Sequence, residues 1–153
     1  MPIPWCKKAV FLLLLGTGLL APRPLLAAQI LQILLPETGR PYLEISIPEN
    51  TVFILRHCNS IYDAWVEERF QVDGRGCLQL EAVRSSSPAV LEYYGLETAS
   101  ADWIPLTRSF DKISLLVSKG GRTSLLLDQE SISLSDHLAD GTRIEMRAFP
   151  PPE

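Results

Sequence analysis

The clearest pattern in the chain is the alternation of apolar and polar residues from Ala64 to Val72. It predicts an extended strand with Val66, Phe70 and Val72 on one side and mostly polar residues on the other. Glu68 falls on the apolar side. A carboxylate on a buried face is costly unless other groups compensate it. The pattern therefore predicts a specific polar partner for Glu68.

A turn signal, Asp73-Gly74-Arg75-Gly76, follows this strand and precedes a second alternating run. A three-residue loop with Gly76 in the left-handed conformation places Asp73 opposite Cys77 and Glu68 opposite Ala82. A four-residue loop is disfavoured because it sets like charges opposite each other and breaks the match of apolar pairs.

The partner expected for Glu68 is Arg84, which lies diagonal to it in the three-residue register. Asn59 or Ser60, at the end of the preceding strand, is expected to add a hydrogen bond to the same carboxylate. These four residues form the candidate polar cluster, either as a binding pocket or as a structural ion pair.

Other segments also show short strand patterns between turn residues. Strands are expected over residues 42–47, 51–57, 112–118, 122–127 and 142–148. The third and fourth of these flank Gly120-Gly121 and are predicted to pair as a hairpin, and a helical turn is expected from Pro88. About seven strands and no long helix predict an all-β domain, either a β-sandwich or an open barrel.

The first 28 residues have the layout of an export signal. Lys7 and Lys8 precede an uncharged run over residues 9–21, and small residues at 26–28 offer a cleavage site. The mature chain is then expected to start near Gln29, with residues 29–153 forming one domain that ends in a short Pro-rich tail at 149–153. This predicts a periplasmic or otherwise exported protein.

The alternative is an uncleaved anchor in the inner membrane, with the domain facing the periplasm. It is considered because residues 25–35 remain apolar, although Pro22-Arg23-Pro24 interrupts the span of about 20 residues that a membrane helix needs. Contact with the membrane is expected only through this uncleaved segment.

The charge of the chain limits the class of partner. Three of the 14 basic residues precede Gln29, which leaves 11 against 18 acidic residues and a net charge of −7 for residues 29–153. This acidic balance argues against nucleic acid and against anionic membrane surfaces.

Two cysteines, Cys58 and Cys77, remain after the predicted signal. In an oxidising compartment they are a candidate disulfide, closing a loop of about 20 residues that would contribute on the order of 3 kcal/mol. Two unpaired thiols are the alternative, since spacing alone fixes no geometry.

Motifs for catalysis and cofactor binding are absent from the sequence. It contains no phosphate-binding loop, HExxH pair, GxSxG elbow or CxxC. Ser135-Asp136-His137 fits a turn better than a catalytic triad, because adjacent residues cannot form one. His57 and His137 are too scattered to indicate a metal. We therefore expect no enzyme activity, no cofactor and no metal site. Aromatic residues could line a binding surface or fill the core; they are Tyr62, Trp65, Tyr93, Tyr94 and Trp103.

One stretch resembles a known bacterial family. Its motifs are Phe53-x-Leu55, Ser60-Ile61-Tyr62, Val66-x-Glu68-x-Phe70-x-Val72, Leu78-x-Leu80 and Tyr94-Gly95. In this order they resemble domain-of-unknown-function family 1850, clearest from residue 52 to 95. Members typically carry His-Ser where this chain has Asn59-Ser60, and His57 stands two residues earlier. The resemblance implies a small exported protein, often encoded beside TRAP-type transporters with a TAXI-type solute-binding protein.

Two functions are therefore expected as alternatives. The first is a non-enzymatic periplasmic accessory protein that serves a TRAP-type transporter, with a permease or a TAXI-type solute-binding protein as partner. The second is a small-ligand binder or hydrolase that uses a polar pocket formed by Asn59, Ser60, Glu68 and Arg84.

Overall fold

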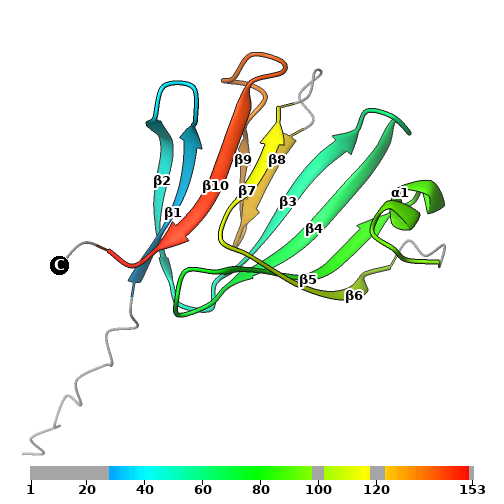
Figure 1. The fold of residues 1–153 in the computed structure, drawn as a ribbon, viewed down its shortest axis with the longest axis horizontal. Helices are drawn as coiled ribbons and strands as arrows, with labels where there is room; N and C mark the ends of the chain where they lie inside the picture. Colours follow the sequence, from blue (N-terminus) through cyan, green and yellow to red (C-terminus); the bar gives the residue numbers. More distant parts are fainter. Residues whose placement is uncertain (1–27, 98–101, 118–122, 152–153) are drawn as a thin grey trace, which may run out of the picture.

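The computed structural model describes residues 28–97, 102–117 and 123–151, which form two antiparallel sheets facing each other (Figure 1). The four-stranded sheet has the order β2 (Arg40–Pro48), β1 (Ala28–Leu35), β10 (Arg143–Phe149), β7 (Ile113–Leu116). The six-stranded sheet has the order β6 (Ile104–Phe110), β5 (Leu78–Ser85), β4 (Ala64–Val72), β3 (Val52–Asn59), β8 (Thr123–Leu127), β9 (Glu130–Ser133). The predicted all-β class is confirmed, and the sheets form an open, sandwich-like arrangement rather than a closed barrel.

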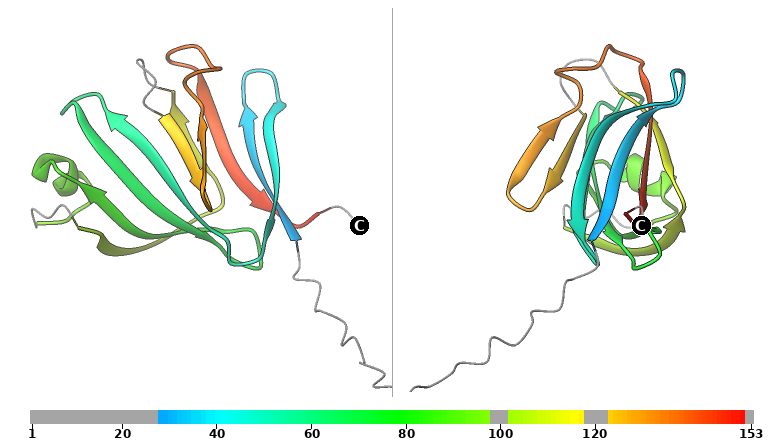
Figure 2. Two further views of the ribbon diagram at one scale, coloured as in Figure 1. Left: turned by 180° about the vertical axis from the view of Figure 1, so that it is seen from behind. Right: turned by 90° about the vertical axis from the view of Figure 1, so that its left-hand side faces the viewer.

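The main core lies between the sheets. The six-stranded sheet contributes Phe53 and Phe70, whose rings stack with centroids 5.3 Å apart. Leu31 and Met146 enter the same core from the four-stranded sheet. Full burial of a side chain of this size stabilises the fold by roughly 1.5–3 kcal/mol. Views from behind and from the side show the two sheets (Figure 2).

A second, smaller core lies under the short helix α1 (Pro88–Tyr93). Pro88 occupies the first turn, where its missing N–H costs no helical hydrogen bond, and the predicted helical turn is confirmed. Val90 and Leu91 of α1 pack on Val66 and Val83. Tyr94, at the end of the helix, contacts both cores and is thereby held over the inner face of β4.

The β4–β5 hairpin has the predicted three-residue loop. The Asp73 N–H donates to the Cys77 carbonyl at 3.0 Å, and Gly76 has φ +86°. Beyond Leu80, however, the register shifts by one residue, and Glu68 lies opposite Val83 instead of Ala82. A β-bulge of one extra residue changes which face the rest of β5 presents.

Some strands differ from the sequence-based predictions. The predicted hairpin of residues 112–118 with 122–127 is wrong, because β7 pairs with β10 and β8 pairs with β3, in different sheets. Val117, which directly follows β7, and Leu125 of β8 are both buried in the main core. Gly120-Gly121 lies outside the described residues. The structure also adds β1, β6 and β9 to the predicted strands.

Strand β1 includes most of the apolar run that raised the possibility of a membrane anchor. Residues 28–35 lie between β2 and β10, with Leu31 and Ile33 in the core. Among the described residues, no helix is long and apolar enough to cross a membrane.

Candidate functional site

Glu68 lies on the inner face of β4, as the alternation predicts, and its side chain is only 14% exposed. The Tyr94 hydroxyl donates to Glu68 Oε1 at 2.9 Å, and His57 Nε2 lies 3.3 Å from Oε2. Burial, together with the neighbouring Glu68 carboxylate, raises the pKa of the Tyr94 hydroxyl, so this group remains a donor. The carboxylate therefore has specific partners, but they are not the expected ones.

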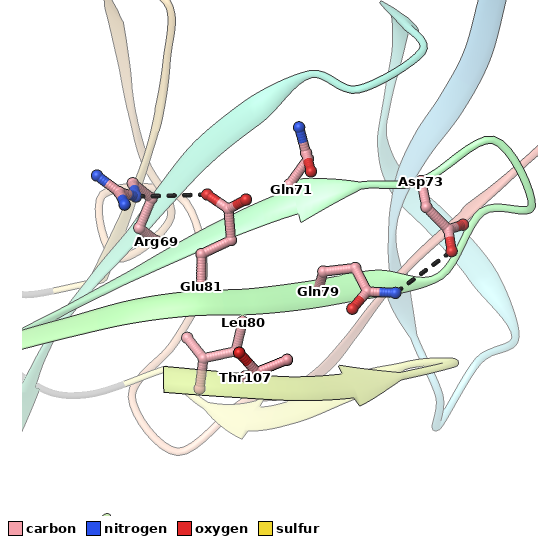
Figure 3. Close-up of a pocket in the computed structure, with 7 residues that line it drawn as sticks. All are labelled: Arg69, Gln71, Asp73, Gln79, Leu80, Glu81 and Thr107. Atoms are coloured by element: carbon pink, nitrogen blue, oxygen red, sulfur yellow. Dashed lines mark hydrogen bonds and ion pairs between the residues drawn. The ribbon is translucent and has the colours of Figure 1, made fainter. Parts of the chain in front are cut away.

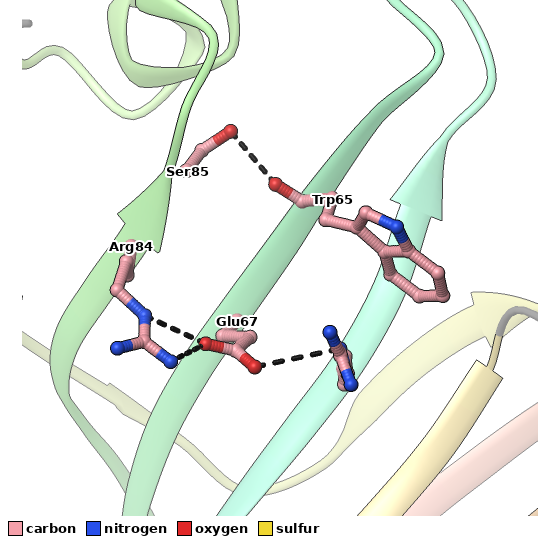
Figure 4. Close-up of polar contacts among 5 residues, drawn as sticks. Trp65, Glu67, Arg84 and Ser85 are labelled. Atoms are coloured by element: carbon pink, nitrogen blue, oxygen red, sulfur yellow. Dashed lines mark hydrogen bonds and ion pairs between the residues drawn. The ribbon is translucent and has the colours of Figure 1, made fainter. Parts of the chain in front are cut away.

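Arg84 lies on the opposite, outer face of the sheet, against Glu67 (Figure 4). Its Nε donates to Glu67 Oε2 at 2.7 Å, and its Nη2 contacts the same oxygen. Arg56 Nε lies 3.4 Å from the other oxygen, Oε1. The predicted Glu68–Arg84 pair is wrong, because the bulge in β5 sets Arg84 opposite Glu67.

Two tryptophans extend this ion cluster. The Arg56 guanidinium lies 4.5 Å from the centre of the Trp65 ring, and that of Arg84 lies 4.7 Å from the centre of the Trp103 ring. Each geometry is that of a cation–π contact. We call these five residues, Arg56, Trp65, Glu67, Arg84 and Trp103, the Trp–Arg face. Of the other aromatic residues considered above, Tyr62 and Tyr93 are exposed, whereas Tyr94 packs inside.

The surface of the Trp–Arg face is shallowly hollowed. A depression of about 210 Å³ is lined by Arg56, Trp65, Glu67 and Arg84, together with Ser85 and Ser86. The Ser85 hydroxyl donates to the Trp65 carbonyl at 2.8 Å, which ties the strands together beside the depression (Figure 4). Trp65 is 40% exposed, an unusual position for the largest apolar side chain.

A second and larger depression, of about 480 Å³, lies further along the same outer face (Figure 3). Mostly polar residues of β4, of the loop that follows it, of β5 and of β6 line this depression, with Arg69 and Glu81 at one end and Asp73 and Gln79 at the other. Arg69 lies 5.5 Å from the centre of the Trp103 ring, which links this depression to the Trp–Arg face.

Asn59 and Ser60 do not join Glu68. The Asn59 Oδ1 accepts the backbone N–H groups of Ile61 and Tyr62, so this side chain closes the β3–β4 turn. Ser60 is exposed in that turn. The structure thus distributes the four residues of the candidate polar cluster over the inner face, the outer face and a turn.

Cys58 and Cys77 lie at opposite ends of β4. Cys58 is opposite Trp65, and Cys77 is opposite Asp73. Eight residues of extended strand span roughly 26 Å, whereas the Cα atoms of a disulfide lie within about 7 Å of each other. The predicted disulfide is wrong for this fold. The Cys58 thiol instead lies 3.6 Å from Asp63 Oδ1.

The remaining candidate residues form no recognisable catalytic or metal site. The Ser135 hydroxyl donates to the Thr123 carbonyl at 3.3 Å, and His137 is exposed in the following turn. Within the described ranges, no three His, Cys, Asp or Glu residues are grouped closely enough to hold a metal ion.

The fold and its outer face define a small two-sheet β-protein with an exposed aromatic and basic surface. Comparison with family models, curated proteins and solved structures finds no match to the chain. The resemblance to family 1850 therefore stays a prediction, and function is argued from the surface itself.

Proposed function

We propose that this protein is an exported, non-enzymatic binding protein that serves as a periplasmic accessory to a TRAP-type transporter. Its partner is a permease or a TAXI-type solute-binding protein, and the Trp–Arg face is the surface that contacts it. The observation that carries this proposal is the 40% exposed Trp65 with Arg56 stacked on it. Trp and Arg are among the residue types most enriched at the energetic centres of protein interfaces.

The charge of the face supports a protein partner with an acidic contact surface. Arg56 and Arg84 share the single carboxylate of Glu67, which leaves this cluster with a net charge of +1. The whole chain carries −4. A local basic surface on an acidic protein orients an acidic partner toward one face and repels it elsewhere.

The fixed conformation of the Arg56 and Arg84 side chains also favours binding. Glu67 and the two tryptophan rings already hold Arg56 and Arg84 in place. Immobilising a flexible side chain on binding costs roughly 0.5–1.5 kcal/mol. Side chains that are ordered beforehand avoid part of this cost.

The alternative, a ligand binder or hydrolase with a pocket of Asn59, Ser60, Glu68 and Arg84, has less support. Glu68 and Arg84 lie on opposite faces of the sheet, and Asn59 is engaged in its own turn. These residues therefore share no pocket.

A pull-down of the tagged protein from membranes tests the proposal. Truncating an interface hot spot costs 2 kcal/mol or more, so Trp65→Ser should weaken recovery of a permease or TAXI-type protein by more than tenfold. Val52→Ser is the matched control, because Val52 is 41% exposed and lies in β3 of the same six-stranded sheet. The protein recovered from the exporting cell should also start near Gln29, as intact mass would show.

Two results would contradict the proposal. One is equal recovery of the transporter component by wild type and Trp65→Ser. The other is recovery of only unrelated proteins, since capture of an unidentified protein does not support a transporter partner.

A further inference from the structure

The larger depression on the outer face arises from two neighbouring irregularities in strand pairing. Between β4 and β5, Phe70 pairs with Leu80 but Arg69 pairs with Ala82, so Glu81 is an extra residue. Between β5 and β6 the pairing also shifts between Leu80 and Ala82. Glu81 thus has no directly opposed residue in either neighbouring strand. We call the depression formed here the bulge hollow; it is lined by Arg69, Gln71, Asp73, Gln79, Leu80, Glu81 and Thr107.

Bulges of this kind redirect side chains and are common beside binding sites. Here the bulge directs the Glu81 carboxylate toward Arg69, with Oε2 lying 3.5 Å from Nε. Arg69 Nε is buried and makes no hydrogen bond within the described part of the chain. The Arg69 side chain as a whole is 40% exposed, so a ligand in the hollow can contact the side chain that Glu81 orients.

At the other end of the hollow, the neutral amides of Gln71 and Gln79 lie beside the Asp73 carboxylate. Gln79 Nε2 donates to Asp73 Oδ2 at 3.3 Å (Figure 3), and Gln79 Oε1 accepts the Ser109 hydroxyl at 2.8 Å. Gln71 Nε2 lies 3.5 Å from the Asn50 carbonyl, at the limit of a hydrogen bond. An amide that is held in this way can still donate a second N–H and accept a further hydrogen bond, and both groups have a fixed direction.

The charges lining the hollow are largely compensated. Arg69 and Glu81 form an ion pair with each other. The backbone N–H of Cys77, that of Arg75 and the Gln79 amide donate to Asp73 and hold the pKa of its carboxyl below the usual value. A charged ligand would have to compete with these internal partners, whereas a neutral one can add hydrogen bonds without breaking them.

We infer that the bulge hollow binds a small, uncharged, hydroxyl-rich molecule such as a monosaccharide or other polyol. Hydroxyl groups both donate and accept hydrogen bonds. This matches a lining that combines a guanidinium, carboxylates, amides and the hydroxyl of the exposed residue Thr107. The hollow is separate from the Trp–Arg face except where Arg69 reaches Trp103. The inference rests on its own geometry and does not depend on a transporter partner.

An NMR titration of the ¹⁵N-labelled protein tests this inference. The probes are glucose, galactose and mannitol as neutral polyols, citrate as an anion and glycine betaine as a zwitterion. At least one polyol should shift the backbone amide signals of Arg69, Gln71, Gln79 and Thr107, and citrate and betaine should not. Because the hollow is shallow and open, saturation is expected only at high ligand concentration.

Three variants make the titration specific. Gln79→Leu preserves side-chain size but removes the amide, and Thr107→Val removes only the hydroxyl; each should weaken polyol binding at least tenfold. Ser131→Ala, at an exposed position of β9, should bind like wild type. Unchanged spectra of remote core residues confirm that the variants fold.

The inference is overturned if no polyol shifts these amides, or if only citrate or betaine does. It is also overturned if Gln79→Leu and Thr107→Val, both folded, bind a polyol with wild-type affinity.

Discussion

The hydrogen bond from Tyr94 to Glu68 should be a major local source of stability. Tyr94→Phe removes only the hydroxyl and leaves Glu68, 14% exposed, without its donor at 2.9 Å. Hydrogen bonds to charged groups contribute about 1.5–3 kcal/mol, and a buried acceptor left unsatisfied costs a similar amount. We therefore expect Tyr94→Phe to lower the free energy of unfolding by about 2 kcal/mol.

A double-mutant cycle isolates this contact. Glu68→Gln should also destabilise the protein, because it weakens the contacts to both Tyr94 and His57. The double variant should lose less than the sum of the two single losses, with a coupling energy of at least 1 kcal/mol. Urea denaturation followed by tryptophan fluorescence gives the free energy of unfolding of wild type, the two single variants and the double variant.

Tyr93→Phe is the matched control, because the same atom is removed from the neighbouring tyrosine, which is 81% exposed. Its effect should lie within about 0.5 kcal/mol of zero. Additive losses in the cycle, or equal small effects of Tyr94→Phe and Tyr93→Phe, would refute the argument that this hydrogen bond is a major local source of stability.

Three further predictions follow from individual contacts. The raised pKa of Tyr94 means that its stabilising contribution is full below pH 10, the unfolded value, and decreases as the pH rises beyond it; alkaline denaturation of wild type should be steeper than that of Tyr94→Phe. Gly76→Ala should cost more than Gly39→Ala in thermal melts. Both glycines have positive φ, but a Cβ at Gly76 would lie 2.6 Å from the Ala148 carbonyl oxygen, whereas none of the described atoms lies within 4 Å of one at Gly39. Cys58 and Cys77 should both be alkylated in denaturant without reductant, and a mass showing their disulfide would contradict the separation along β4.

The sequence was informative where local chemistry decides structure. The Asp73 to Gly76 loop, the Ala64–Val72 strand and the inward position of Glu68 all depend on short-range alternation or turn geometry, and each is as predicted. The partner of Glu68 depended on the register of β5, which changes at a bulge. The sequence did carry a signal for this bulge, because the adjacent residues Ala82 and Val83 are both apolar and interrupt the alternation of β5. Both are buried in the structure.

Long-range pairing was harder to predict. Residues 112–118 and 122–127 read as a hairpin because they are neighbours in sequence, yet β7 and β8 belong to different sheets. Their partners β10 and β3 lie far away in the chain, and alternation does not identify them. Trp65 and Trp103 were considered as binding-surface residues. Their contacts with Arg56 and Arg84 were not predicted for the same reason, because these residues come from separate parts of the sequence.

The pairing of β1 with β10 has a consequence for how the protein is made. Ile30 lies opposite Phe149, and the Arg147 side chain donates to Gln32 across 115 positions of sequence. Closing so long a loop is entropically costly, and folds rich in distant contacts form slowly. The central pair of the four-stranded sheet can form only after the last strand has been synthesised. The four-stranded sheet is therefore completed late in folding, whereas the β4–β5 hairpin of the other sheet joins neighbouring segments of the chain and can form early.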